Sequence, residues 1–192
     1  MDPIREHSIL NVSKLSPGEV FERLKNVEYM ADEFYMEKTI FKAFHHRIYE
    51  GIDLSMRKLS LPEKEFAEGK VTHRSRDLYV AKRIFEVFPE DSIPKIVKLF
   101  ESGDAVTKGN VIRVSGKLAA PAVDRLLMNA LYDKTVCDQQ DPEADGPPMR
   151  ICDLAYNQLV LRFQVKDVLR TLGPIHRTDN RDYHIAILKG KL

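Results

Sequence analysis

Two short motifs in this chain of 192 residues place a histidine two positions before a hydroxyl side chain. The first is His-Arg-Ser at 73–75 and the second is His-Arg-Thr at 176–178, so their histidines lie 103 residues apart. An imidazole titrates near neutral pH and is the commonest general acid or base in enzymes. The first chemistry to consider is therefore acid–base catalysis by His73 and His176.

These paired motifs resemble those of the two-histidine phosphoesterases. The resemblance implies that His73 and His176 act as acid and base on a cyclic phosphate, while Ser75 and Thr178 hold its oxygens. The local context departs from the family pattern, in which each motif lies in an apolar strand and has an apolar middle residue. Here both middle residues are arginine and both segments are polar. Two surface histidines are the alternative interpretation.

Other chemistries find no support in the spacing of residues. The chain has no GxGxxG, GxxxxGK[ST], GxSxG or HExxH motif. His45 and His46 are adjacent, so on a helix they point about 100° apart and cannot hold one ion together. The remaining histidines and the two cysteines match no zinc spacing. We expect no metal and no cofactor.

The composition indicates a globular protein. The hydrophobic fraction is 43% and the net charge is +1, which excludes a strongly basic protein of the histone type. Only Cys137 and Cys152 occur, and two cysteines in a chain of this size are most simply reduced thiols. The N-terminus has no apolar signal region, and the longest nearly apolar run, 118–123, is far below the ~18 residues of a membrane span. We expect an intracellular protein, cytoplasmic or nuclear, with no membrane association.

The first half predicts a helical lobe over 1–103. Ser16, Pro17 and Glu19 form a helix start, because the serine can cap and the glutamate follows three residues later. From Tyr29 to Glu50 apolar residues recur at helical steps, with Gly51 as a break and a second helical piece up to residue 59. The polar segment 62–76 predicts a mobile connection, and two more helices follow it.

The second half predicts a lobe over 104–192 with some β structure, although a single domain for the whole chain is the alternative. Residues 110–115 and 183–189 predict strands, because β-branched or alternating apolar residues occur there. Helices are predicted from Pro121 and over 153–172, with an exposed acidic, proline-rich loop at 138–148 between them. The fold class is therefore mainly α with a small β element, α+β, and this helix–strand–helix–loop–helix–strand unit resembles a winged helix.

A row of basic residues follows the predicted helix over 153–172. Arg162, Lys166 and Arg170 recur every four residues and would share one face, which Arg177 and Arg181 could extend. Such a row suits contact with the phosphates of a nucleic acid, as the second helix of a winged helix makes. A plain solvated face or a protein-contact face is the alternative.

The function predicted from these patterns is a non-enzymatic binding or assembly protein. Between residues 29 and 59 the helices carry more apolar positions than one face can bury, so we expect a homo-oligomer or a protein partner there. Nucleic-acid contact through the basic row would add to this function. The competing class is a phosphoesterase acting through His73 and His176.

Overall fold

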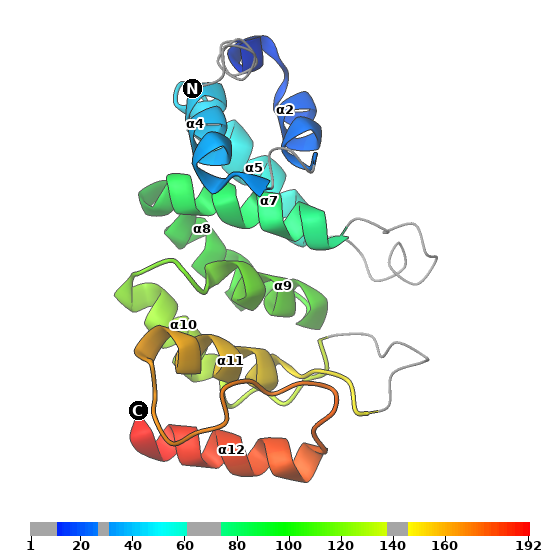
Figure 1. Ribbon diagram of the computed structural model, residues 1–192, viewed down its shortest axis with the longest axis vertical. Coiled ribbons are helices and arrows are strands. Elements are labelled where there is room, and N and C mark those ends of the chain that lie inside the picture. Colours follow the sequence, from blue (N-terminus) through cyan, green and yellow to red (C-terminus); the bar gives the residue numbers. More distant parts are fainter. Residues whose placement is uncertain (1–10, 27–30, 61–73, 138–145) are drawn as a thin grey trace. The chain divides into compact units, whose positions relative to one another are not determined.

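The computed structural model describes residues 11–26, 31–60, 74–137 and 146–192, and these are almost entirely helical (Figure 1). The chain divides into two compact units, unit 1 (Met1–Lys95) and unit 2 (Ile96–Leu192). In chain order the described elements are η1 (Val12–Lys14), α2 (Pro17–Leu24), α4 (Glu33–Phe44), α5 (Ile48–Leu59), α7 (Arg74–Val87), α8 (Pro89–Ser102), α9 (Ala105–Ser115), α10 (Pro121–Ala130), α11 (Ile151–Phe163) and α12 (Thr178–Lys191).

The predicted start of α2 is confirmed in atomic detail. Ser16 accepts a hydrogen bond from the backbone N–H of Glu19, and the Glu19 carboxylate accepts one from the Ser16 N–H at 2.8 Å. Pro17 follows as the first helical residue, where its missing N–H costs nothing. This capping box fixes the residue at which α2 begins.

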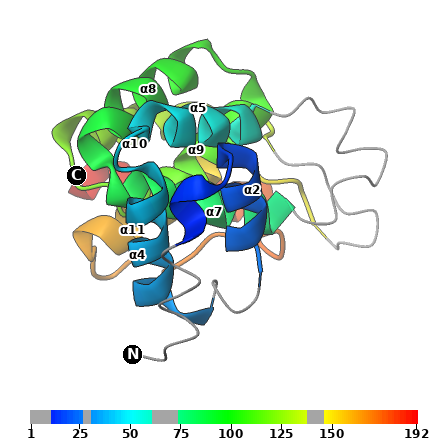
Figure 2. The same cartoon turned by 90° about the horizontal axis from the view of Figure 1, so that it is seen from above.

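The single helix predicted from Tyr29 to Glu50 is wrong in its boundaries. The chain breaks after Phe44, and α5 begins at Ile48 and continues through Gly51. Gly51 is not a helix break but a point of close approach, because a Cβ there would lie 2.9 Å from the ring of Phe44. Helices α2 and α4 lie side by side in both views (Figure 1, Figure 2), and α7 packs against α4 and α5.

The α+β prediction is wrong. Within the described ranges of unit 2 the only β feature is one isolated antiparallel bridge between Val136 and Arg150. The segment predicted as a strand at 110–115 belongs to α9. Asp104 caps the N-terminus of this helix, because its side chain accepts a hydrogen bond from the Thr107 N–H at 2.7 Å. Packing outweighs the β preference of its branched residues, because most of the helix is buried.

The second predicted strand, 183–189, is also helical and lies in α12. Its buried residues are Arg181, Ile185 and Leu188, which recur at steps of four and three. Tyr183, which the strand pattern placed with Ile185, is instead 64% exposed. A winged helix needs strands at both positions, so the chain does not form that unit.

The helix predicted over 153–172 spans only Ile151–Phe163. It stops because Gln164 takes a left-handed conformation with φ 49°. The chain then folds back over α11, where the Asn157 side chain donates to the Leu172 carbonyl at 2.8 Å and accepts from its N–H at 2.6 Å. Leu172, which was predicted to lie in the last turn of this helix, is instead buried in the returning segment beside Asn157.

The two predicted mobile segments lie largely outside the described residues. Of the connection at 62–76, only 74–76 are described, in the first turn of α7. Of the acidic loop at 138–148, only 146–148 are described, and they pass close to α12.

Candidate functional site

The histidine motifs fall in different units. His73 lies outside the described residues, and Ser75 lies in α7 of unit 1. In unit 2, His176 precedes α12 and Thr178 is its first residue. The Nδ1 atom of His176 lies 3.0 Å from the backbone nitrogen of Gly173 and 3.3 Å from its carbonyl oxygen, so the ring is held against its own turn. The described motif therefore lies in a turn and a helix start, and phosphoesterase chemistry stays a prediction.

Two of the five predicted nucleic-acid contacts, Arg162 and Arg181, are held inside unit 2. The Arg162 guanidinium forms an ion pair with Asp124 of α10 and donates to the carbonyls of Gly116 and Leu118, at 3.1 and 2.7 Å. These bonds join α11 to α10 and to the loop after α9. Both arginines use their donors on protein acceptors rather than presenting them to a ligand.

The other three predicted contacts, Lys166, Arg170 and Arg177, are exposed. Lys166 and Arg170 lie beyond the end of α11, and Arg177 immediately precedes α12, so no helix carries them together. The single basic row that the sequence predicted is therefore not present. Nucleic-acid contact through these three residues stays a prediction.

A buried charge cluster at the α11–α12 contact was not predicted. Arg181 and Asp153 are both fully buried and pair at 2.9 Å, and Arg150 approaches the same carboxylate at 2.8 Å. Asp182 links Arg150 to Lys134, each at 2.8 Å. The hydrogen bond from Lys134, together with the hydrogen bond and positive charge of Arg150, lowers the pKa of Asp182, although burial opposes this shift. The cluster joins α12 to the start of α11.

Cys152 lies beside this cluster and is fully buried. Burial, reinforced by the negative charge of Asp153, raises the pKa of the Cys152 thiol to about 11. The thiolate is the reactive form of cysteine, so this side chain is a packing residue at neutral pH. Cys137 is also buried, and both cysteines are free thiols as predicted.

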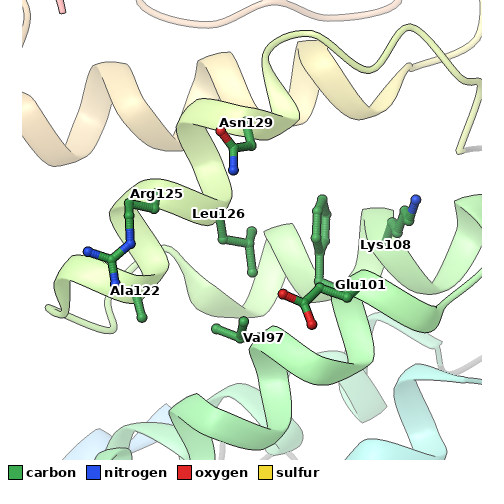
Figure 3. A pocket seen from close by; sticks show the side chains of 8 residues that line it. Val97, Glu101, Lys108, Ala122, Arg125, Leu126 and Asn129 are labelled. Carbon is green, nitrogen blue, oxygen red and sulfur yellow. The ribbon is translucent and has the colours of Figure 1, made fainter.

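A hollow of unit 2 lies between α8 and α10, beside the start of α9, and has a volume of about 370 Å³ (Figure 3). Its apolar lining consists of Val97, Phe100, Ala122 and Leu126. Its polar lining consists of Glu101, Lys108, Arg125 and Asn129. In the sequence these polar residues look like the solvated side of ordinary amphipathic helices, so no pattern could have singled them out.

An exposed aromatic stripe on α4 is the second candidate in the described structure. We define it as Phe34, Lys38, Phe41 and His45, which recur at steps of four, three and four. The two phenylalanines are 60% and 55% exposed, whereas the opposite side of α4 is buried. This stripe falls inside the predicted contact region 29–59. In the same region Tyr49 is also exposed, whereas Tyr35 is buried.

Comparisons with known proteins do not assign the chain to a family. No family of known proteins matches the sequence, no curated protein is significantly similar to it, and no solved structure shares its fold at a significant level. Among the described residues no helix is long and apolar enough to cross a bilayer, and no three metal-ligating side chains gather at one point.

Proposed function

We propose that this chain is a non-enzymatic assembly protein, and that it self-associates through the aromatic stripe on α4. The observation that carries the proposal is the exposure of Phe34 and Phe41 two helical turns apart on one helix. Large apolar side chains exposed together on a regular surface usually mark a protein contact.

The stripe is ordered by its own contacts. The Lys38 ammonium lies 4.3 Å from the centre of the Phe34 ring, and the His45 ring stacks on Phe41 at 5.4 Å with an interplanar angle of 15°. Phe41 also faces Phe88 at 6.3 Å. Aromatic side chains held in one orientation lose little conformational entropy when a partner covers them.

The spacing of the stripe suits a helix as its partner. Steps of four, three and four are those of a helical packing seam, into which a second helix fits its own side chains. In an antiparallel pair of α4 helices related by a two-fold axis, Lys38 would meet Phe41 of the second copy and His45 would meet its Phe34. Each phenylalanine would then contact a cationic or imidazole group, which an aromatic face attracts. The stripe is therefore complementary to itself.

The available burial is of a useful size. A phenylalanine side chain can bury about 150–250 Å², so the exposed parts of Phe34 and Phe41 offer roughly 200 Å² together. At about 25 cal/mol per Å² this is near 5 kcal/mol for each copy, before the cost of association. These two residues are therefore expected to dominate the contact.

Sedimentation equilibrium of the full chain tests the proposal. We expect the wild-type chain to dimerise in a concentration-dependent way between ~1 and ~200 µM, and F34E and F41E each to remain monomeric. The matched control is Y183E, which places the same charge on an equally exposed aromatic of α12 and should dimerise as the wild type does. A wild-type chain that is monomeric throughout this range, or a Y183E chain that loses the dimer equally, would refute the proposal.

A further inference from the structure

The hollow between α8 and α10 is independent of the α4 stripe and lies wholly in unit 2. One wall is α8, which contributes Val97 and Glu101, one turn apart. The other wall is α10, which contributes Leu126 and, one turn further on, Asn129. Figure 3 shows Val97 and Leu126 facing each other across the space, with Arg125 and Lys108 near its two ends. The hollow is therefore a short groove with an apolar floor and polar ends.

The polar groups of this groove differ in how far they are already used. Lys108 lies 4.0 Å from Asp133, and its ammonium lies 5.7 Å from the centre of the Phe100 ring. Glu101 and Arg125, by contrast, have no polar side-chain contact with any described residue. One anion and one cation therefore remain available to a ligand.

The dimensions favour an extended chain over a compact molecule. From Ala122 to Asn129 the α10 wall runs seven residues, which is about 10 Å at 1.5 Å per residue. An extended peptide advances about 3.3 Å per residue, so three residues would match this length. The volume also falls in the lower part of the range of binding sites, which is about 300–1,000 Å³.

We propose that this groove binds a three-residue extended segment of a partner protein in which an apolar side chain lies between a basic and an acidic one. The apolar side chain would enter between Val97 and Leu126. Glu101 would accept from the basic side chain and Arg125 would donate to the acidic one. The carboxamide of Asn129 can both donate to and accept from the peptide backbone.

Methyl-detected NMR titration of the full chain tests this proposal with defined probes. The probes are N-acetylated, C-amidated tripeptides: Lys-Leu-Glu, Lys-Leu-Lys and Glu-Leu-Glu. We expect Lys-Leu-Glu to shift the methyl signals of Val97 and Leu126 and to bind about two- to fivefold more tightly than either like-charged peptide. That ratio is what one exposed ion pair contributes.

Charge reversal should change the preference in a predictable direction. The E101K chain, which gains a cation in addition to Arg125 and Lys108, should prefer Glu-Leu-Glu. The R125E chain, which gains an anion in addition to Glu101, should prefer Lys-Leu-Lys. The matched control K98E changes a charge on the exposed side of α8, outside the groove, and should keep the wild-type order of affinities. Circular dichroism of each variant would confirm that the helices are intact.

Three results would overturn the proposal. The first is the absence of methyl shifts at ~10 mM Lys-Leu-Glu. The second is equal affinity for all three peptides, which would mean apolar contact without charge recognition. The third is equally tight binding of free leucine, which would make the groove a site for a compact zwitterion rather than for a peptide.

Discussion

The replacement of Arg181 by methionine should strongly destabilise unit 2. The Arg181 side chain is 0% exposed and donates to the carbonyls of His176, Pro148 and Pro147 at 2.8, 2.9 and 2.6 Å. It also pairs with the buried carboxylate of Asp153 at 2.9 Å. Methionine would retain the volume of the stem and remove every one of these donors.

The expected loss follows from what the substitution leaves behind. Removal of one partner from a buried ion pair typically costs about 3–5 kcal/mol, because the other charge stays buried. Arg150 still contacts Asp153, which holds the cost within that range rather than above it. R181K should lose a smaller part of the free energy of unfolding than R181M, because an ammonium can pair with the carboxylate but cannot reach three carbonyls as a guanidinium does.

Hydrogen exchange followed by mass spectrometry measures this loss where it occurs. For amides of α11 and α12 that exchange by unfolding of unit 2, about 3–5 kcal/mol corresponds to exchange roughly 10²–10³-fold faster or more. The control is R177M, four residues earlier, whose side chain is 87% exposed and should change stability by within about 0.5 kcal/mol. Equal exchange in the two variants would show that the buried cluster does not hold α12.

Three further outcomes are expected. G146A should destabilise by about 1–3 kcal/mol in a thermal melt, because Gly146 has φ +153° and an added Cβ would lie 1.9 Å from the Pro174 carbonyl oxygen; a neutral result would contradict that geometry. G190A should stabilise by up to about 1 kcal/mol, because nothing lies within 4 Å of the new methyl group in α12; destabilisation would contradict it. Cys152 should resist a thiol reagent until the protein unfolds. Because burial raises its pKa to about 11, the stability that its neutral thiol contributes should be complete below pH ~9 and lost between pH ~9 and ~11. The C152A variant should therefore lose less stability than the wild type between these two pH values.

Helix starts could be predicted from the sequence where the signal is local. The capping box of Ser16 is formed by residues three positions apart, and the structure contains it as predicted. Pro121 likewise opens α10, as predicted. Such signals depend on groups within one helical turn, so they can be found without knowledge of the rest of the fold.

The strand predictions failed because they rested on the β preference of branched side chains. The packing that outweighs this preference cannot be seen in the sequence. Val111, Ile112 and Val114 point in different directions around α9, and all three are buried there. A strand would have placed them on two opposite faces. Similarly, α11 ends at a left-handed Gln164, although the apolar spacing continues beyond it. That spacing continues because Leu172, in the returning segment, is also buried. The same periodicity thus has two structural origins.

The candidate sites show the same limit. The stripe on α4 lies in the region where excess apolar residues predicted a contact, because exposure follows from having more apolar positions than one buried face can hold. The groove between α8 and α10 could not be predicted, because it depends on how far apart two helices stay. No local pattern reports that distance.

The basic residues of the last quarter show how the fold uses charge. Residues 151–192 carry a net charge of +3, which predicted a positive stripe. Arg162 and Arg181 instead point inward, where their several N–H donors satisfy carbonyls at the ends of helices and loops. An arginine that spans carbonyls has the same sequence spacing as one that faces solvent, so periodicity cannot separate the two. With these two side chains turned inward and Lys166, Arg170 and Arg177 on separate segments, no single helix of the described structure carries the predicted row.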